Sequence, residues 1–306
     1  MTVRVLVVGG TGMLGHKLVH VLSADSGLDV HTSVRRPGQA AFLHPDATYH
    51  PDVDLSTGTE SIARLLTSLA PDVVINAVGA IKQRDLYADI DQTYFINGSL
   101  PHLLSHLNPN RNGRTIHFST DCVYTGDRGN YAESTAPDSL DVYGRSKAVG
   151  EIAYGRHLTI RTSIIGFETA AHLGLVGWLL RQPTGSTVSG YSRAIFSGLP
   201  TVSLSRTVHS LIVGDSERCG LWHVASEPIT KLELLQRLNA ALSLGLEVTP
   251  SDTVRIDRSL DDSRFRLATH TLRPNWDTLI AELATDFASL PYAALYDALR
   301  RQAAPV

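Results

Sequence analysis

The chain has 306 residues, 43% of them hydrophobic and 19% charged, which predicts a globular protein able to bury a large core. Its formal net charge of −3 is spread without an acidic or basic tail, so nothing favours binding to nucleic acid or to a membrane surface. Two cysteines exclude a disulfide framework, and no segment approaches the roughly 20 apolar residues of a membrane span, so we expect a cytoplasmic protein.

Strand and helix signals alternate through the first half of the chain. Residues 3–8 form a continuous apolar run, which is typical of a strand buried on both faces of a parallel sheet. Further strands are expected at 30–34, 73–77, 115–119 and 158–165, and helices at 12–22, 61–69, 94–107 and 139–154. This β-α-β-α rhythm predicts the α/β class and, within it, a doubly wound parallel sheet of the Rossmann type.

The alternation loosens after about Gly166. Glycine and serine cluster between Gly185 and Gly198, and helical patterns return near 231–243 and 276–290. We therefore expect residues 1–165 to form a dinucleotide-binding domain and residues 166–306 to form mainly a smaller substrate-binding region. Some segments of that region are expected to return to the Rossmann sheet.

A glycine-rich turn follows the first predicted strand and opens the first predicted helix. Its spacing, Gly9-x-x-Gly12-x-x-Gly15, permits a tight turn and close approach of the backbone to a pyrophosphate at the helix N-terminus. Because a strand precedes it and a helix follows it, we interpret the turn as a dinucleotide-binding loop rather than a purely structural one. The residues expected to contact the cofactor here are Gly9, Thr11, Gly12, Met13 and Leu14.

The residues after the second strand bear on which dinucleotide is bound. An NAD site usually carries an acid about 20 residues beyond the loop, whereas this chain has Ser33, Arg35 and Arg36 there. A guanidinium can pair with the extra phosphate of NADP, so we predict NADPH as the cofactor, with Arg35 as the main contact. Two solvated arginines at a strand end are the alternative. The remaining expected cofactor contacts are Asp54, Leu55, Ala77, Val78 and Lys147.

Tyr143 and Lys147 stand four residues apart on a predicted helix, which places both side chains on one face. An unperturbed tyrosine has a pKa of about 10, and a nearby ammonium together with the positive nicotinamide ring would lower that pKa. Tyr143 could then protonate a carbonyl oxygen as hydride arrives at the carbon. Thr120, at the end of the predicted strand 115–119, could hydrogen-bond the same oxygen. An exposed helix pair and a strand-end cap are the structural alternatives.

With these residues in place, the chain resembles the extended short-chain dehydrogenase/reductases, and within them the dTDP-4-dehydrorhamnose reductase-like group of sugar-nucleotide reductases. The resemblance runs along nearly the whole chain. It rests on the segments 9–15, 75–77, 95–97, 119–121, 143–147, 161–163 and 198–201. It implies that Thr120, Tyr143 and Lys147 form the catalytic triad and that Asn97 supports the active site.

The residues after Thr120 separate this chain from one related group and relate it to another. Sugar-nucleotide 4,6-dehydratases resemble this stretch but carry an Asp-Glu pair, and here Asp121 is followed by Cys122, so dehydration is not expected. GDP-fucose synthases, which epimerise a 4-keto sugar before reducing it, look similar and use a cysteine and a histidine as acid and base. Cys122 and His172 could fill those roles; a buried structural cysteine and an ordinary loop histidine are the alternatives.

Further candidates concern the substrate and a metal ion. The expected substrate-binding set is Asp121, Cys122, His172, Trp178, Arg258 and Arg264. Either arginine could clamp a pyrophosphate, with a salt-bridged surface turn as the alternative, and Trp178 could stack on a base or sugar unless it packs in the core. His102 and His106 share a helix face, but no glutamate follows the first histidine as in zinc hydrolases, so we predict no metal site.

The sequence as a whole predicts an NADPH-dependent reductase of the 4-keto group in a dTDP- or UDP-linked 4-keto-6-deoxysugar, with Tyr143 as the proton donor. A bifunctional epimerase/reductase is one alternative. A non-catalytic NADP-binding regulator is the other, because a regulatory subunit of methionine adenosyltransferase resembles the same reductase group. The complete set of Thr120, Tyr143 and Lys147 favours the enzyme. The resemblance also permits a homodimer.

Overall fold

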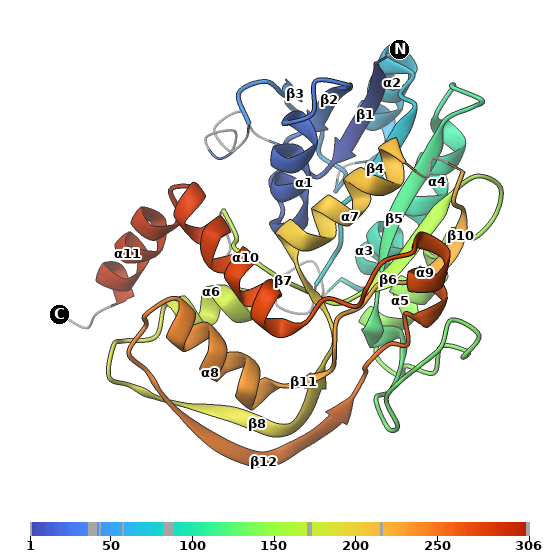
Figure 1. Cartoon of the computed structure of the whole chain (residues 1–306). Coiled ribbons are helices and arrows are strands. Elements are labelled where there is room, and N and C mark those ends of the chain that lie inside the picture. The colour runs from blue at the N-terminus through green and yellow to red at the C-terminus, as the bar shows by residue number, and fades with distance from the viewer. Residues whose placement is uncertain are drawn as a thin grey trace. The chain divides into compact units, whose positions relative to one another are not determined.

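The computed structural model describes residues 2–35, 42, 44–56, 58–81, 89–169, 173–214 and 217–303. The chain forms two compact units, both discontinuous in sequence (Figure 1). The first comprises Met1–Tyr124, Ala136–Arg161 and Leu204–Trp222, and the second comprises Thr125–Thr135, Thr162–Ser203 and His223–Val306. Among the helices in the described ranges, none combines the length and the apolar character that crossing a bilayer requires.

A seven-stranded sheet with the order β10-β6-β5-β4-β1-β2-β3 forms the centre of the first unit. Its strands are β1 (Val3–Val8), β2 (Leu28–Ser33), β3 (Thr48–His50), β4 (Val73–Asn76), β5 (Arg114–Thr120), β6 (Leu158–Thr162) and β10 (Gly220–His223). The pairs β1–β2, β1–β4, β2–β3 and β4–β5 are parallel. Because the chain leaves β1 first toward β2 and later toward β4, the strand order reverses beside β1. The doubly wound α/β fold expected from the sequence is confirmed.

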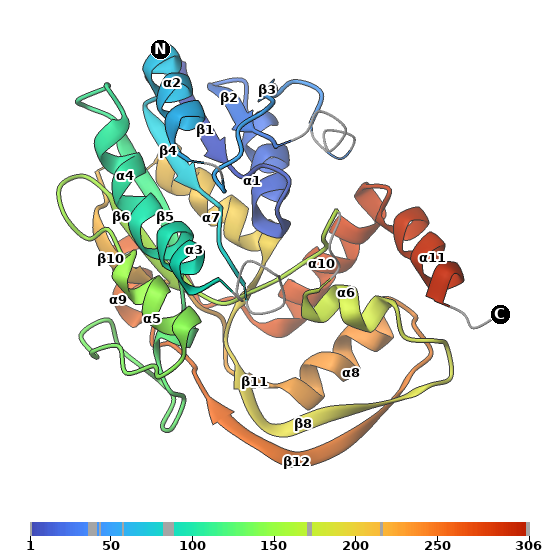
Figure 2. The same ribbon diagram turned by 180° about the vertical axis from the view of Figure 1, so that it is seen from behind.

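Helices pack on both faces of this sheet. They are α1 (Met13–Ser23), α2 (Glu60–Leu69), α3 (Ile90–Tyr94), α4 (Leu100–Leu107), α5 (Val142–Val149) and α7 (Thr201–Val213), with a π-helical turn at Phe95–Ser99 and a 3₁₀ turn at Asp121–Val123. Figures 1 and 2 show α1 and α7 on one face and α2, α4 and α5 on the other. Two-sided coverage explains why the central strands β4 and β5 are buried at every position rather than at alternate ones.

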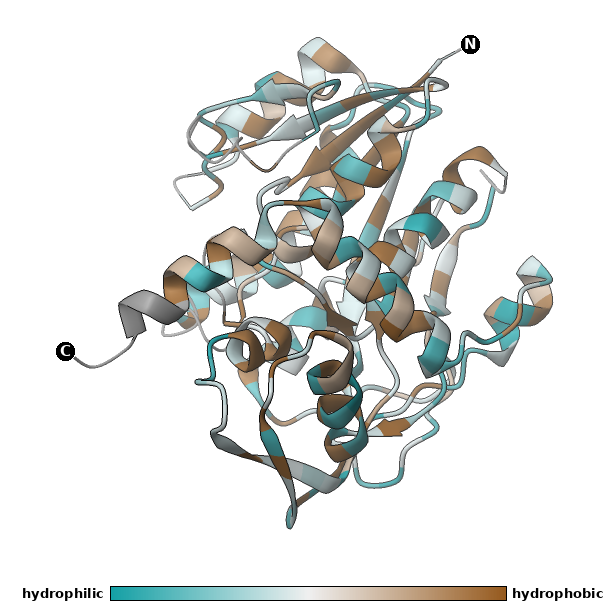
Figure 3. Cartoon of the chain, turned by 60° about the vertical axis from the view of Figure 1, so that its left-hand side comes forward, coloured by the Kyte–Doolittle hydropathy of each residue, from teal (hydrophilic) through white to brown (hydrophobic). Residues whose placement is uncertain are grey.

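The core of the first unit lies where β1 and β4 meet the helices on one face of the sheet. Leu6 and Val74 from the strands pack with Ile62, Leu66 and Leu104 from α2 and α4, and all five are fully buried. Burying a side chain of this size contributes about 1.5–3 kcal/mol each. Figure 3 shows the same pattern, with brown apolar residues along strands and helices banded in brown and teal. This packing fixes the strand ends on which the candidate site is built.

Two predicted elements are shorter than the sequence suggested. The helix expected at 139–154 spans only Val142–Val149: the Asp141 carboxylate caps its start by accepting a hydrogen bond from the Gly144 N–H, at 2.8 Å. At its other end, a Cβ on Gly150 would lie 1.9 Å from the Asn97 carbonyl oxygen, so only glycine fits there. The strand expected at 158–165 is divided into β6 and β7 (Ile164–Ile165), and β7 pairs with β9 (Leu199–Pro200) outside the large sheet.

The second unit has a smaller sheet of three strands in the order β11-β8-β12. Its remaining elements are α6 (Leu175–Leu180), β8 (Thr187–Phe196), β11 (Ile229–Thr230), α8 (Lys231–Ala241), β12 (Glu247–Asp257), α9 (Ser263–Thr269), α10 (Trp276–Ser289) and α11 (Tyr292–Ala303). The rings of Phe167, Phe287 and Tyr292 form an aromatic core: the centroid of the Phe167 ring lies 5.0 Å from that of Phe287 and 4.7 Å from that of Tyr292. The sequence predicted α8 and α10 but not the long strands β8 and β12.

Candidate active site

Strand register places the predicted cofactor and catalytic residues along one edge of the large sheet. Val8 is level with Ser33 on β2 and with Asn76 on β4, and Asn76 is level with His117 on β5. The segments that follow these strands therefore leave the sheet at its carboxyl edge. In doubly wound folds, ligands bind at this edge, beside the point where strand order reverses.

The glycine turn after β1 adopts a conformation that needs glycine. Gly9 has φ +91°, and a Cβ there would lie 2.6 Å from a methyl carbon of Val78. A Cβ on Gly15 would lie 2.1 Å from the Gly9 carbonyl oxygen, so the first turn of α1 lies directly against the loop. Side chains at these positions would force the backbone apart.

Helix α1 begins directly after this turn, with Gly12 as its N-cap. No side chain caps the helix, and its first turn carries no acidic residue; α1 lies wholly within the described chain. Its N-terminal N–H groups and helix dipole thus suit an anionic group such as a pyrophosphate. Among the other predicted contacts, Thr11 and Met13 are partly exposed, whereas Leu14 is buried.

His16 supports the loop from within α1, a role that the sequence reading missed. It is fully buried, and its ring Nδ1 lies 2.8 Å from the Gly12 carbonyl oxygen. Burial is the main cause that lowers its pKa to about 3, so the ring is neutral near pH 7 and Nδ1–H donates this hydrogen bond. A histidine directly after Gly15, in a helix that must pack on the sheet, was the available signal.

The end of β2 contacts the glycine loop directly. The buried Ser33 hydroxyl accepts a 3.1 Å hydrogen bond from the Gly9 N–H, and the Ser33 carbonyl accepts a 3.2 Å bond from Gly10 N–H. Arg35 follows β2 with an exposed side chain, whereas Arg36 lies outside the described residues. Ser33 therefore helps to hold the loop in shape, and Arg35 is available to a ligand.

The other predicted cofactor contacts lie along the same edge. Asp54 accepts hydrogen bonds from the N–H and the hydroxyl of Ser56, at 2.9 and 2.7 Å, and Leu55 is buried. The Ala77 N–H donates to the Val8 carbonyl at 3.0 Å, which joins the segment after β4 to the end of β1. Asn76 accepts from Val78 N–H at 3.2 Å, so the backbone at Val78 is fixed beside Gly9.

Thr120, Tyr143 and Lys147 are brought together at the end of β5. The side chains of Thr120 and Tyr143 are hydrogen-bonded, and Lys147 Nζ donates a 2.9 Å bond to the carbonyl of Phe118, two residues before Thr120. Thr120 Oγ1 also donates to Asp121 Oδ1 at 3.0 Å and accepts from Cys122 N–H at 3.1 Å. Helix α5 and strand β5 thus place a phenol, a hydroxyl and an ammonium in one small region.

The pKa of Tyr143 is raised above its ordinary value, contrary to the sequence expectation that Lys147 would lower it. Burial is the largest cause, and negative charge at Cys122, Asp121 and Asp141 adds to it, against the opposing effect of the hydrogen bond with Thr120. Tyr143 is therefore a protonated phenol near pH 7. A group in that state can donate a proton but cannot act as a base.

Burial has the opposite effect on Lys147, because its charged form is the protonated one. Desolvation lowers its pKa to about 8, while the negative charge of Glu151 raises it. At neutral pH the ammonium therefore remains charged by a small margin. The surroundings of Lys147 offset only part of the cost of burying its charge, as expected for a group that must also interact with a ligand.

Asn97 lies in the π-helical turn between α3 and α4. It is fully buried; its side chain accepts from Ala80 N–H at 2.9 Å and donates to the Ala80 carbonyl at 3.0 Å and to Ser146 Oγ at 3.1 Å. It therefore joins the segment after β4 to helix α5, one residue before Lys147. This contact agrees with the supporting role that the resemblance implied, and π-helical turns often occur at functional sites.

The predicted substrate residues fall in both units. Cys122 is partly buried and close enough to Tyr143 for its charge to affect that phenol, whereas His172 lies outside the described residues. Trp178, on α6, and Arg258 are partly exposed members of the second unit. Arg264 is half-exposed there, with Nη1 3.8 Å from Glu133 Oε1.

The pair His102 and His106 is engaged in hydrogen bonds. Both ring nitrogens of His102 are engaged, with Tyr154 OH at 2.9 Å and the Val149 carbonyl at 2.8 Å, and His106 Nδ1 lies 2.7 Å from the His102 carbonyl. Across the residues with described positions, no three His, Cys, Asp or Glu side chains are grouped to hold a metal ion.

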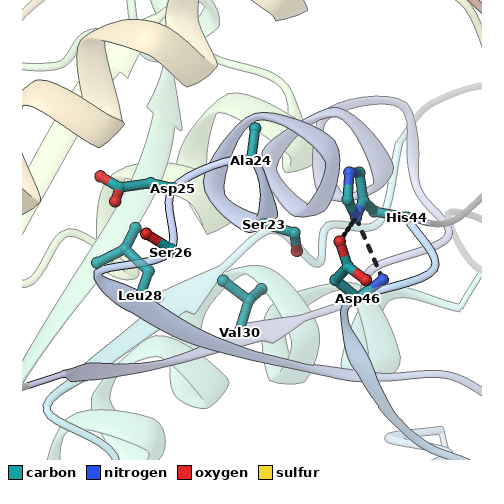
Figure 4. A pocket seen from close by; sticks show the side chains of 8 residues that line it. All are labelled: Ser23, Ala24, Asp25, Ser26, Leu28, Val30, His44 and Asp46. Carbon is teal, nitrogen blue, oxygen red and sulfur yellow. Dashed lines mark hydrogen bonds and ion pairs between the residues drawn. The ribbon is translucent and has the colours of Figure 1, made fainter.

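A hollow of about 510 Å³ lies at the opposite edge of the large sheet (Figure 4). Its lining includes Ser23, Asp25 and Leu28 from the connection between α1 and β2, with His44 and Asp46 beside them. Because this connection precedes β2, the hollow lies at the amino end of that strand, away from the glycine loop and Tyr143. It is a separate surface feature.

Comparison with known proteins agrees with this geometry. Residues 3–260 match the family model described as "RmlD substrate binding domain". A dTDP-4-dehydrorhamnose reductase of Aggregatibacter actinomycetemcomitans is 26% identical over 237 residues, covering 74% of each chain. A probable dTDP-4,6-dihydroxy-2-methyloxan-3-one 4-ketoreductase of Streptomyces antibioticus is 36% identical over 154 residues, covering 49% of this chain and 46% of that protein.

Solved structures show the same fold. The crystal structure of a dTDP-4-dehydrorhamnose reductase from Bacillus anthracis, in complex with NADP, has a TM-score of 0.74 to this chain. The match covers 94% of this chain and all of the Bacillus anthracis chain, with 18% sequence identity. At that identity, the likeness establishes the architecture.

Proposed function

Because this chain belongs to the RmlD substrate binding domain family, we propose that it is an oxidoreductase that reduces the 4-keto group of a nucleotide-linked 4-keto-6-deoxysugar with NADPH. The relatives named above as reductases support reduction of a sugar-nucleotide ketone. The observation that carries the proposal is the meeting of Thr120, Tyr143 and Lys147 at the edge of the sheet that also holds the glycine loop. A regulator would not need this proton-donating set.

The residues present fit a dinucleotide. The positive φ of Gly9 and the uncapped start of α1 leave a backbone cradle that a side chain would fill. We propose that this cradle binds the pyrophosphate and that Arg35 binds the 2′-phosphate, with Arg36 as a second candidate. The exposed guanidinium of Arg35 is suited to that role because a phosphate can accept two of its hydrogen bonds. NADP is the cofactor in the Bacillus anthracis relative.

The chemistry then divides between cofactor and protein. NADPH supplies a hydride to the carbonyl carbon. Tyr143, held protonated by its raised pKa, donates its proton to the carbonyl oxygen, so that the ketone becomes an alcohol. Thr120 positions the phenol through their hydrogen bond, and Lys147, bonded to the Phe118 carbonyl, holds helix α5 against the strand that ends at Thr120.

The nucleotide and the sugar would be bound partly by the second unit, which we propose as the substrate-binding region. Arg258 and Arg264 are its candidates for the substrate pyrophosphate, and Trp178 is its candidate for stacking on the base or sugar. The contact of Arg264 with Glu133, at 3.8 Å, is long enough to be exchanged for a phosphate. The nucleotide is proposed to be dTDP or UDP.

A second candidate function is epimerisation before reduction. Its support is the placement of Cys122 beside Tyr143, where a thiolate could remove a proton next to the ketone. The proposed acid/base partner of Cys122 is His172. Exchange of sugar protons with heavy water during turnover would favour this candidate, and product formed without such exchange would rule it out.

The proposal is tested by NADPH oxidation with dTDP-, UDP- and GDP-linked 4-keto-6-deoxysugars, followed by absorbance. Tyr143→Phe should lower kcat by about 100-fold or more, the range for loss of a general acid, and leave NADPH affinity within about threefold. Tyr154→Phe, which removes an exposed phenol hydroxyl from the same unit, is the matched control and should keep full activity. If no sugar supports NADPH oxidation although NADPH still binds, the substrate assignment is contradicted.

A further inference from the structure

A buried ion pair lies close to the end of strand β5, which carries Thr120. Glu151, just after α5, accepts hydrogen bonds from Arg161 on β6: Nε to Oε1 at 2.6 Å and Nη2 to Oε2 at 2.7 Å. The side chains of Arg161 and Glu151 are only 3% and 10% exposed. This is a two-point contact between a guanidinium and a carboxylate, the strongest arrangement such a pair can adopt.

The pair also grips both ends of the segment 119–124, which carries Thr120, Asp121 and Cys122. Ser119 Oγ donates to Glu151 Oε1 at 2.7 Å, and Arg161 Nη1 donates to the Tyr124 hydroxyl at 2.6 Å. The Arg161 guanidinium also lies over the Tyr124 ring, 5.4 Å from its centroid. All four side chains belong to the first unit.

Stability alone is a poor reason for such a pair. Removing two charges from water costs several kcal/mol, and well-packed apolar residues often serve equally well. Glu151 also follows Lys147 by four residues, so it lies one turn further along the chain that leaves α5. The ion pair thus lies between Lys147, which binds the Phe118 carbonyl, and the segment 119–124.

We propose that Glu151, held by Arg161, is a positioning residue of the active site: it fixes the segment 119–124 and provides the negative charge that balances the Lys147 ammonium. This role deepens the reductase function proposed above and rests on it for its catalytic consequence. The other part of the proposal, that the charge of Glu151 acts on Lys147, does not depend on any substrate.

The surroundings of Lys147 single out Glu151. Tyr143, four residues earlier on the same helix, is a protonated phenol. His117, on β5, is close enough for the charge of Lys147 to act on it, and burial keeps its ring neutral by lowering its pKa well below the usual value. Asn97, from the π-helical turn, is uncharged. Burial lowers the pKa of Lys147 to about 8, and Glu151 is the group that opposes this change.

The test is an NMR titration of the lysine side chains in the full chain, without cofactor or substrate. Only Lys17, Lys82, Lys147 and Lys231 contribute signals, and Lys147→Arg assigns the relevant one. In Glu151→Gln the pKa of Lys147 should fall by about one unit, the lower end of the effect of a nearby opposite charge. Ser119→Ala removes a neutral hydrogen bond to Glu151 and should leave that pKa unchanged.

A second variant keeps the test valid if Glu151→Gln fails to fold, because that substitution leaves the Arg161 charge buried without its partner. The double variant Glu151→Gln/Arg161→Met removes both charges and should show the same fall in the pKa of Lys147. An unchanged pKa in either folded variant would overturn the proposal. Where turnover is measurable, the alkaline limb of kcat/KM should move down with the pKa; absence of turnover would count against the reductase function and leave the NMR result decisive for Glu151.

Discussion

Lys147 Nζ lies 2.9 Å from the Phe118 carbonyl oxygen, so the ammonium on α5 is bonded to the strand that ends at Thr120. This bond aligns the helix carrying Tyr143 with the strand end that carries its hydrogen-bond partner. It also requires a charged amine to be almost fully buried, which is why its pKa falls to about 8. The site is therefore organised at some expense to stability.

Replacing Lys147 with Met should separate stability from activity. The folded-state pKa of Lys147 is lower than its unfolded value, so the unfolded chain holds the extra proton between about pH 8 and pH 10.4. The buried ammonium therefore disfavours folding below about pH 8, by on the order of 3 kcal/mol, and this penalty is relieved as pH rises through that window. Lys147→Met should be inactive yet unfold at an equal or higher denaturant concentration near neutral pH.

Urea unfolding at neutral and at alkaline pH measures this effect. The advantage of the Met variant over the parent chain should shrink as pH rises, because only the parent chain recovers stability. A Met variant that is less stable than the parent at neutral pH by more than about 1 kcal/mol would show that the Phe118 contact outweighs desolvation.

Gly9→Ala should impair cofactor binding more than its strain alone explains. Gly9 has φ +91°, and the added Cβ would press on Val78 at 2.6 Å. We expect a loss of about 1–3 kcal/mol in stability and at least a tenfold rise in the Kd for NADPH. Gly155→Ala is the control, because Gly155 also has positive φ but a Cβ there meets only His157, at 3.7 Å. Equal NADPH affinity in both variants would contradict a role for the Gly9 loop.

The sequence predicted the α/β fold of the first unit because its central strands β1 and β4 are largely apolar segments that alternate with helical patterns along the chain. The site residues expected from the sequence, Gly9, Thr120 and Tyr143, lie at element boundaries, where register along the parallel strands places the strand ends at one edge of the sheet. Periodicity could not show that Gly150 ends α5, because the reason is the Asn97 carbonyl from a distant segment.

Burial energetics were the other part that the sequence did not provide. The spacing of Tyr143 and Lys147 indicated a lowered phenol pKa, but desolvation and the acids Asp121 and Asp141 raise it. Likewise, nothing local in the sequence pairs Glu151 with Arg161, since their contact depends on how α5 meets β6. The sequence did not predict strands β8 and β12, because they are half-exposed and rich in polar residues.

His16 should make the protein sensitive to acid. Its folded-state pKa is about 3, below the unfolded value of 6.5, so the unfolded chain binds an additional proton between these values. Stability from this group is complete above about pH 6.5 and declines as pH falls, by on the order of 5 kcal/mol in total. His16→Gln should therefore flatten the dependence of unfolding free energy on pH in this window.

Chemical denaturation across the acid range, with His270→Asn as a control, checks this prediction. His270 is an exposed histidine with positive φ, a conformation that asparagine tolerates. The control should keep the parent slope. A His16→Gln protein with the parent slope would show that other groups govern the acid response.

Arg35→Ser should change cofactor preference without changing stability. The side chain is exposed after β2, so its loss should alter the unfolding free energy by less than about 0.5 kcal/mol. Loss of a charge-assisted contact with the 2′-phosphate should raise the KM for NADPH about tenfold or more and leave the KM for NADH unchanged. Arg64→Ser, at an exposed position on α2, is the control for the loss of one positive charge. Equal effects of both substitutions would contradict a specific contact at Arg35.

The most direct test of the proposed reaction is to supply NADPH with deuterium at C4 of the nicotinamide and to locate the label in the product. Each face of the ring should be labelled in turn, and the product sugar analysed by mass spectrometry and proton NMR. The account predicts one deuterium per product, at C4 of the sugar and from one face only, with Tyr143→Phe forming the same labelled product about 100-fold or more slowly. Product that carries no deuterium at C4, or carries it at another carbon, would contradict reduction of the 4-keto group by this protein.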